Sequence, residues 1–515
     1  MTISEAEKDS LPKVTFPARV VEKVLRNRGK RAAKAHQKKR TYKGPVVISC
    51  KRAQYNHRQG QPYSRFSPTE NLSSGGWKNR KSVGDYFTIN AHGISSFQNP
   101  AWNEVAESAS FSDLGIHPEL VEQLTKFKIN QPTNVQQKAI PEILSGYNVI
   151  CAAETGSGKT LAFLLPMLHR ILELKKTKFF SETPPNTPHG LILTPSRELA
   201  DQIHGVTRDL CHEGINIHPH LVTGGRGTQN ILKWKPQSAM DVLITTPGIC
   251  TKLLTNGLVN PSLLQTLVLD EADTLLDDSF STLVLSLIKR LRISSEKPLN
   301  PSAESSSVVG TQVALVSATM PRDLQKILAD IVPFDSMKLV QTNHLHRIMP
   351  HVSQKFMRLK AGDKLVQLVK HLKKKSNLNY IVFTNQSKTA QFISYYLREN
   401  GIDNTLFHAN MAQKVREGRF SEFQSNEPNS SNVLVCTDVA SRGLDTIHAH
   451  HVINFDFPNF VSDYIHRVGR VGRVASTQSG FALSFVSAKW EVECLWKIEV
   501  HTGGLRPLAV SYSRP

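Results

Sequence analysis

Residues 148–160, NVICAAETGSGKT, have the types and the order that phosphate binding requires. An apolar run typical of a buried strand leads into Gly156 and Gly158, and a helical pattern begins after Lys159 and Thr160. Glycines let backbone N–H groups curl around phosphate oxygens, lysine reaches the β- and γ-phosphates, and threonine offers a hydroxyl to Mg²⁺. A chance Gly/Ser turn before a helix is the weaker alternative. The predicted cofactor-binding residues of this stretch are Ala153, Glu154, Thr155, Gly156, Ser157, Gly158, Lys159 and Thr160.

A second polar group follows the apolar run LQTLVLD, which ends at Asp270 and continues into Glu271 and Asp273. In a doubly wound parallel sheet, residues at the carboxyl ends of strands face the ligand crevice. We therefore expect Asp270, with Thr160, to hold Mg²⁺ against a nucleotide, and Glu271 to orient and deprotonate the attacking water. A helix-start cluster of acids is the alternative, which a phosphate loop on a neighbouring strand disfavours.

A weaker signal lies in QVALVSATM, where Ser317 and Thr319 follow another strand-like run. Their hydroxyls would reach Asp273 and report the state of the nucleotide, although Ser and Thr at a strand end are common in simple turns.

Strand-like and helical patterns alternate from Phe111 onward in two successive series. The first series contains NVICAA, GLILT, DVLITT, QTLVLD and QVALVS; the second contains YIVFTN, NTLFHA, NVLVCT, HHVINFD and GFALSFV. The pattern predicts an α/β protein with two doubly wound parallel-sheet domains, at 109–340 and 353–515, joined by a linker at 341–352. Polar inserts at 294–307 and 425–431 are expected to be surface loops.

Residues 1–108 are basic and lack apolar periodicity, so we expect a largely disordered N-terminal extension. The whole chain carries 63 Lys and Arg against 43 Asp and Glu, a net charge of +20, which indicates a nucleic-acid partner. Interleaved aromatic residues suit RNA binding through phosphate contacts and base stacking, and a solvated tail or a targeting address fits the composition equally well. These aromatic residues are Tyr55, Tyr63, Phe66, Trp77, Tyr86 and Phe87.

The six cysteines form no C-x-x-C pair, so neither a zinc site nor a disulfide framework is expected. No apolar run approaches the roughly 20 residues of a membrane-spanning helix, so no membrane insertion is expected. Nothing in the sequence calls for an oligomer, and we expect a monomer.

The strings AETGSGKT, DEAD and SAT, in that order on one α/β unit, resemble the DEAD-box RNA helicases of superfamily two. Further pieces match the family in order: NQPTNVQQKAIP, PSRELA, the doublet at 224–225, TTPG, VFTN, HANMAQKVR, CTDVASRGLD and HRVGRVGR. The resemblance covers residues 111–486. It implies two tandem RecA-like domains that bind ATP and Mg²⁺ as cofactors and RNA as partner.

The resemblance also implies roles for single residues. Gln136 would read the adenine edge, Phe111 would stack on the ring, and Asp445 would contact the sugar. The RNA backbone would be contacted by Arg197, Glu198, Gly225, Thr246, Gln413, Arg416 and Thr437. The catalytic residues would be Lys159, Asp270 and Glu271 with the arginine fingers Arg470 and Arg473. The coupling residues would be Asp273, Ser317 and Thr319, together with His466 and Arg467, which would bridge from the second unit.

The sequence departs from the family pattern at Glu154, Ser196, Ile249, Ala409 and Val471. None of these is a phosphate, metal or water-activating position. The loss of Arg at 249 concerns unwinding strength more than hydrolysis.

Strings such as DEADTLLD and IMPHVSQKFMRLK are most similar to an animal mitochondrial subgroup, implicated in assembly of the large mitoribosomal subunit. This resemblance implies an RNA helicase that acts on rRNA with ribosome assembly proteins in the mitochondrial matrix. The acids Glu5, Glu7 and Asp9 do not suit a presequence, so a nuclear or nucleolar location stays open. An ATP-gated RNA clamp or assembly scaffold with little unwinding activity is the alternative function, and a DNA helicase is a third.

Overall fold

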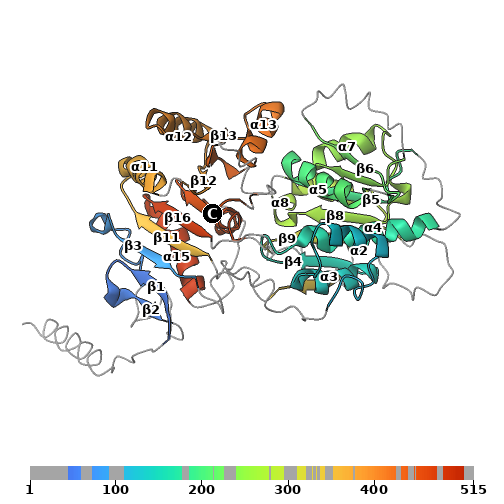
Figure 1. Ribbon diagram of the computed structural model, residues 1–515, viewed down its shortest axis with the longest axis horizontal. Coiled ribbons are helices and arrows are strands. Elements are labelled where there is room, and N and C mark those ends of the chain that lie inside the picture. The colour runs from blue at the N-terminus through green and yellow to red at the C-terminus, as the bar shows by residue number, and fades with distance from the viewer. Residues whose placement is uncertain are drawn as a thin grey trace, which may run out of the picture.

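The computed structural model describes residues 44–58, 72–91, 109–176, 185–212, 214–224, 239–277, 280–294, 310–319, 327–328, 332, 337–342, 352–374, 377–424, 431–438, 446, 448–472 and 480–503. They form two α/β units that lie side by side (Figure 1), the first within 109–342 and the second within 352–503 with two N-terminal stretches added. Among the described residues, no helix is long and apolar enough to cross a bilayer.

The first unit is built on a parallel sheet of seven strands in the order β10-β4-β9-β8-β5-β7-β6. Its strands are β4 (Asn148–Ala152), β5 (Gly190–Leu193), β6 (Pro219–Val222), β7 (Val242–Thr245), β8 (Thr266–Asp270), β9 (Gln312–Ser317) and β10 (Met337–Gln341). Its helices are α2 (Pro118–Lys126), α3 (Asn134–Leu144), α4 (Lys159–Lys176), α5 (Arg197–Leu210), α7 (Pro247–Thr255), α8 (Ala272–Leu275) and α9 (Ser281–Ile288).

Both faces of this sheet are covered because successive strand residues point to opposite sides. In β4, Val149 and Cys151 belong to the core cluster under α3, α4 and α5, whereas Ile150 belongs to the cluster under α7, α8 and α9. The central residues of β4 are therefore apolar on both faces of the sheet, and the carboxyl end of β8 carries the polar Asp270.

The second unit contains nine strands in the order β13-β14-β12-β15-β16-β11-β3-β1-β2, parallel from β13 to β11. These parallel strands are β11 (Ser353–Arg358), β12 (Tyr380–Phe383), β13 (Thr405–Phe407), β14 (Val433–Cys436), β15 (His451–Asn454) and β16 (Phe481–Val486). The helices are α11 (Lys364–Lys374), α12 (Ser387–Glu399), α13 (Gln413–Gln424), α14 (Val461–Val468) and α15 (Lys489–Gly503). Each strand expected in both series is present; β6, β10 and β11 were not expected.

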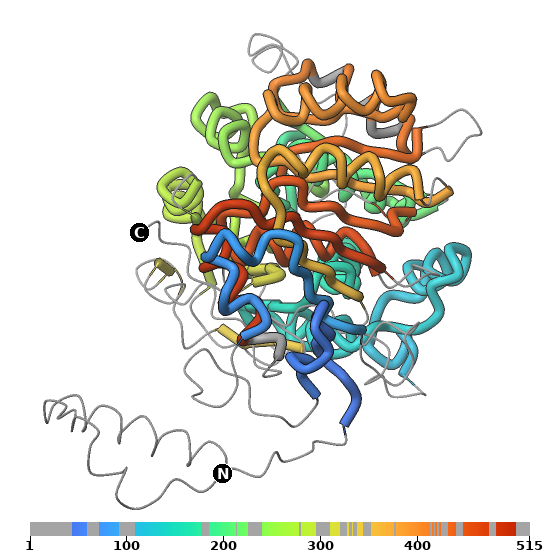
Figure 2. Tube along the Cα trace, turned by 90° about the vertical axis from the view of Figure 1, so that its left-hand side faces the viewer, coloured from blue at the N-terminus to red at the C-terminus, as the bar shows by residue number. Residues whose placement is uncertain are grey.

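Two stretches of the N-terminal 108 residues are folded, where the sequence predicted disorder. The strands β1 (Val46–Cys50), β2 (His57–Arg58) and β3 (Tyr86–Ile89) extend the second sheet, and β3 pairs antiparallel with β11. Figures 1 and 2 show these N-terminal strands beside β11 and α15. The prediction of disorder is therefore wrong for 44–58 and 72–91; the remainder of 1–108 lies outside the described residues.

Aromatic packing explains why these short strands fold. The ring of Phe87 stacks on that of Phe356 in β11, with centroids 4.9 Å apart, and Trp77 packs on Phe87 at 5.4 Å. Trp77 is only 2% exposed. These rings belong to the core cluster that also contains α14 and α15, so the N-terminal stretches complete the hydrophobic core of the second unit.

Candidate active site

The phosphate loop connects β4 to α4. Gly156 and Gly158 have φ angles of 76° and 93°, a left-handed conformation that favours glycine. Lys159 lies over the loop, where its Nζ donates to the carbonyls of Ala153 at 2.9 Å and Glu154 at 2.8 Å. Burial lowers the pKa of Lys159. The loop thus presents an amine whose hydrogen-bond partners among the described residues are backbone carbonyls, which an anionic phosphate would replace.

The start of α3 braces this loop. Thr133 caps the helix, and its hydroxyl donates to the Ser157 carbonyl at 2.8 Å. The Gln136 amide accepts from the Thr133 N–H and donates to the Gly158 carbonyl, both at 2.9 Å. Gln136 is therefore next to the phosphate loop, and its reading of adenine stays a prediction. Stacking by Phe111 also stays a prediction, because that ring is 2% exposed and belongs to the core.

The acidic residues lie at the end of β8. The buried Asp270 carboxylate accepts from the Glu271 N–H at 2.9 Å, and burial, followed by the charge of Glu271, raises the pKa of Asp270 to about 7. Glu271 has a φ of 53°, which is unusual for a residue other than glycine and is typical of functional sites. Its Oε2 is buried and has no hydrogen-bond partner among the described residues. Such an oxygen is suited to accept a proton from a bound water.

These residues fit a magnesium ion. Thr160 and Asp270 supply hydroxyl and carboxylate oxygens, the hard ligands that Mg²⁺ prefers. A buried carboxylate with a raised pKa is also stabilised by a nearby cation. Thr160 lies after β4 and Asp270 ends β8. These strands were expected to be neighbours, but β9 lies between them in the sheet.

The carboxyl end of β9 completes a cluster around Asp273. The Thr319 hydroxyl donates to Asp273 Oδ2, and the Thr319 N–H donates to the Ser317 hydroxyl at 3.2 Å. Nε2 of His466, from α14 in the second unit, lies 3.2 Å from the same Asp273 oxygen. The structure thus brings four predicted coupling residues together, and His466 joins the two units.

Among the described residues, the contacts of the Arg467 side chain all lie within the second unit, so its role as a bridge to the first unit stays a prediction. Its Nε and Nη2 form a bidentate pair with Asp438 at 2.6 and 2.8 Å, and Nη2 also donates to Asn385 at 2.7 Å. Burial acts to lower the pKa of Arg467, but the charge of Asp438, its hydrogen bonds to Arg467 and the charge of Asp463 together outweigh burial, and the pKa is raised. Arg467 therefore organises the interior of the second unit.

The backbone after α14 meets the phosphate loop directly. A Cβ atom added to Gly469 would lie 1.8 Å from the Thr155 hydroxyl, so only glycine permits this approach. The next residue, Arg470, is buried, and its Nε donates to the His466 carbonyl at 3.2 Å. Arg473 and Asp445 lie outside the described residues.

One pair of predicted RNA-binding residues joins the two units. Arg416 in α13 forms an ion pair with Glu198 in α5 at 3.0 Å. The Arg197 guanidinium lies 3.0 Å from the position that a Gly224 Cβ would take. Thr246 is the N-cap residue of α7. Thr437, directly after β14, donates its N–H to the carbonyl of Phe407 at the end of β13. Gly225 and the side chain of Gln413 lie outside the described residues.

One contact of the site was not foreseen. The hydroxyl of Thr342, directly after β10, donates to the buried Glu154 carboxylate of the phosphate loop. The only sequence signal was Glu154 itself, since a buried carboxylate needs a donor. Asp438 and Gly469 were likewise missed as partners of the site.

Residues 133–327 match the DEAD/DEAH box helicase family, and residues 363–475 match the helicase conserved C-terminal domain. With the phosphate loop, the acidic strand end and the contacts between the units, these matches define an ATP-hydrolysing helicase of two RecA-like domains.

Two curated relatives define the family more narrowly. Probable ATP-dependent RNA helicase DDX28 of Mus musculus is 39% identical over 473 residues, 89% of this chain and 84% of the relative. The Homo sapiens protein of that name is 37% identical over 507 residues, 96% of this chain and 90% of the relative. The chain belongs to the DEAD-box ATP-dependent RNA helicases. The predicted family, enzyme class and use of ATP and RNA are confirmed.

Solved structures confirm the fold class. S. cerevisiae Dbp5 bound to RNA and ADP BeF3 is similar with a TM-score of 0.63 and 26% identity, covering 78% of this chain and 96% of that one. Mss116 bound to ssRNA and UDP-BeF also has a TM-score of 0.63, with 25% identity over 74% of this chain and 76% of that one.

Proposed function

We propose that this helicase clamps a single RNA strand between its two units when ATP binds, and separates short duplexes by local strand distortion. The observation that carries the proposal is the hydrogen-bonded group of Asp273, Thr319 and His466, which links the ATP site to the second unit. Because ATP and RNA would each contact both units, each ligand should favour binding of the other.

The chain's own residues would share the hydrolytic work. Lys159 would exchange its carbonyl partners for the β- and γ-phosphates, and Glu271 would take the proton of the attacking water. Arg470 and Arg473 would stabilise the charge on the γ-phosphoryl oxygens once the units close. Mg²⁺, held by Thr160 and Asp270, would neutralise phosphate charge.

RNA would compete with the ion pair between Arg416 and Glu198. A phosphate that binds Arg416 removes this pair, so RNA would exchange one contact between the units for a contact of its own. Binding through the sugar–phosphate backbone carries little sequence information, so we expect little sequence preference.

Steady-state ATP hydrolysis with and without single-stranded RNA tests the mechanism. Wild type should be strongly stimulated by RNA, Glu271→Gln should lack hydrolysis, and His466→Ala should keep basal hydrolysis but lose most of the stimulation. His448→Ala, an exposed histidine of the same unit, is the matched control. Full stimulation in His466→Ala would contradict the coupling role.

The competing function is an ATP-gated RNA clamp or assembly scaffold with little unwinding. Ile249 favours it, because this side chain is buried in the core where the family pattern has arginine, and one cation near the RNA face is lost. If scaffolding suffices, Glu271→Gln should replace wild type in cells that lack the protein. A growth defect would support the helicase.

We also propose rRNA as the main substrate, with ribosome assembly proteins as partners, in the mitochondrial matrix, and a monomeric state. Support comes from the +20 net charge and the resemblance to a mitochondrial subgroup. Cell fractionation followed by RNA crosslinking tests both location and substrate: recovery in nucleoli with cytosolic rRNA would favour the alternative. Light scattering on the purified chain tests the monomer.

A further inference from the structure

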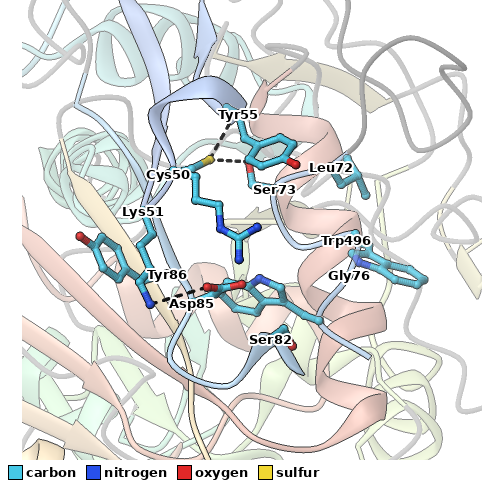
Figure 3. A pocket seen from close by; sticks show the side chains of 13 residues that line it. Cys50, Lys51, Tyr55, Leu72, Ser73, Gly76, Ser82, Asp85, Tyr86 and Trp496 are labelled. Carbon is cyan, nitrogen blue, oxygen red and sulfur yellow. Dashed lines mark hydrogen bonds and ion pairs between the residues drawn. The ribbon is translucent and has the colours of Figure 1, made fainter. Parts of the chain in front are cut away.

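A pocket of about 580 Å³ lies in the second unit, between the N-terminal strands and α15 (Figure 3). All its lining residues come from the N-terminal stretches except Trp496, so none belongs to the ATP site or to the first unit. The strands β3, β1 and β2 occupy the outer end of the second sheet, away from the first unit (Figure 1). Its volume is in the range of small-ligand sites.

The walls of the pocket are held by buried hydrogen bonds. The fully buried Glu499 of α15 accepts from the N–H groups of Ser73 and Ser74, at 2.5 and 3.1 Å, and from the Ser74 hydroxyl. The Trp496 indole donates to the Ser74 carbonyl at 3.2 Å, and Lys78 lies 4.6 Å above the Trp496 ring. The pocket is therefore formed before any ligand arrives, by the second unit alone.

Aromatic rings form part of the accessible lining. Tyr55 is 49% exposed, Tyr86 is 37% exposed, and both rings are labelled at opposite sides of the pocket in Figure 3, with Trp496 on a third side. Lys355 lies 4.3 Å from the Tyr86 ring, on the neighbouring strand. The structure thus separates two uses of the N-terminal aromatic residues: Trp77 anchors the core, whereas Tyr55 and Tyr86 stay accessible.

Cations stand beside these rings. The Arg52 side chain is exposed and makes no hydrogen bond or ion pair with the described residues. Lys51 donates to the Gly84 carbonyl at 3.0 Å and lies 3.8 Å from Asp85, so its charge is partly balanced. Burial raises the pKa of the Cys50 thiol to about 11, so the pocket carries no thiolate at neutral pH. The lining thus favours a flat ligand with a negative charge next to it.

Single-stranded RNA has this chemistry: an unpaired base has a π-face for stacking, and its flanking phosphates pair with Arg and Lys. We propose that the pocket is a second RNA-binding site, which stacks an unpaired base on Tyr55, Tyr86 or Trp496 while Arg52 and Lys51 bind phosphates. It would hold RNA outside the cleft and without ATP, because one unit forms it completely.

The test measures RNA affinity of the full chain without nucleotide, by fluorescence anisotropy, using a single strand of a few nucleotides and one several times longer. Tyr55→Ala combined with Arg52→Ala should weaken binding of the longer strand roughly tenfold. ATP hydrolysis stimulated by the short strand should not change. This second readout separates failure of the pocket proposal from failure of the cleft mechanism.

Tyr395→Ala combined with Lys289→Ala is the matched control, because both side chains are exposed and lie outside the pocket and the ATP site. Equal loss in the control, or unchanged affinity in the pocket variant, would overturn the proposal. Crosslinking with thiouridine-labelled RNA is the second measurement, and crosslinks should map to 44–58 or 72–86. Crosslinks confined to the cleft, or a pocket variant that loses a bound protein but no RNA affinity, would refute an RNA site.

Discussion

The cleft and the pocket at the N-terminal edge differ in how they would bind RNA: two units form the cleft, and one unit forms the pocket. The cleft depends on contacts between units, such as His466 with Asp273 and Arg416 with Glu198. The pocket at the N-terminal edge is made by one unit and held by the buried Glu499. A site shared by two units can be switched by a ligand that moves them, whereas a site within one unit stays formed throughout the cycle.

Gly469→Ala should have the largest effect, and it should act on the cleft between the units. A methyl group at 469 meets the Thr155 hydroxyl at 1.8 Å, so the units cannot approach as closely. RNA-stimulated hydrolysis should fall about a hundredfold, as expected when transition-state groups are misplaced. Gly362→Ala is the control, because nothing lies within 4 Å of its added Cβ. Activity above half of wild type in Gly469→Ala would show that this contact is dispensable.

Trp77→Ala should disrupt the pocket at the N-terminal edge, because it removes the buried ring that holds the N-terminal strands against the core. The buried indole packs on Phe87, and truncation of such a ring costs about 3–5 kcal/mol. Urea unfolding should show this loss, while Tyr55→Ala, at an exposed ring, should stay within about 0.5 kcal/mol of wild type. Equal stability of the two variants would mean that the strands do not contribute to the core.

Glu198→Gln should have a smaller effect, on the RNA affinity of the cleft. Loss of the carboxylate removes the partner of Arg416 and a negative charge beside the RNA path. The pair is mostly shielded from water, so RNA affinity without ATP should rise about two- to fivefold. Titration of a short strand measures this effect, and Glu399→Gln, at the end of α12, controls for net charge. Weaker binding in Glu198→Gln would instead show that the side chain contacts RNA.

Much of the parallel architecture could be predicted from the sequence, because buried parallel strands are continuous apolar runs that end in polar motifs. Asp270 and Ser317 lie at the strand ends where the sequence placed them. Partners distant in the chain could not be predicted: Thr342 reaches Glu154 across 188 positions. The pairing of Arg467 with Asp438 could not be predicted either, since the motif does not show that this carboxylate lies beside it.

The N-terminal strands escaped prediction for a related reason. β2 has two residues and β3 has four, too few to show a period, and β11, the partner of β3, lies more than 260 positions away. Their aromatic residues suggested RNA binding, and only packing separates Trp77 in the core from Tyr55 at the pocket.

The tapering edge of the second sheet also bears on solubility. Without β3, the six-residue β11 would present unpaired backbone N–H and C=O groups along its outer side, with the Phe356 ring uncovered beside them. Such an edge is a template for pairing between chains. The N-terminal strands replace it with β2, which has two residues and ends in Arg58. A chain shortened to begin at residue 109 would keep every helicase motif. Its β11 would become an exposed edge strand, and the protein would aggregate through pairing of these edges.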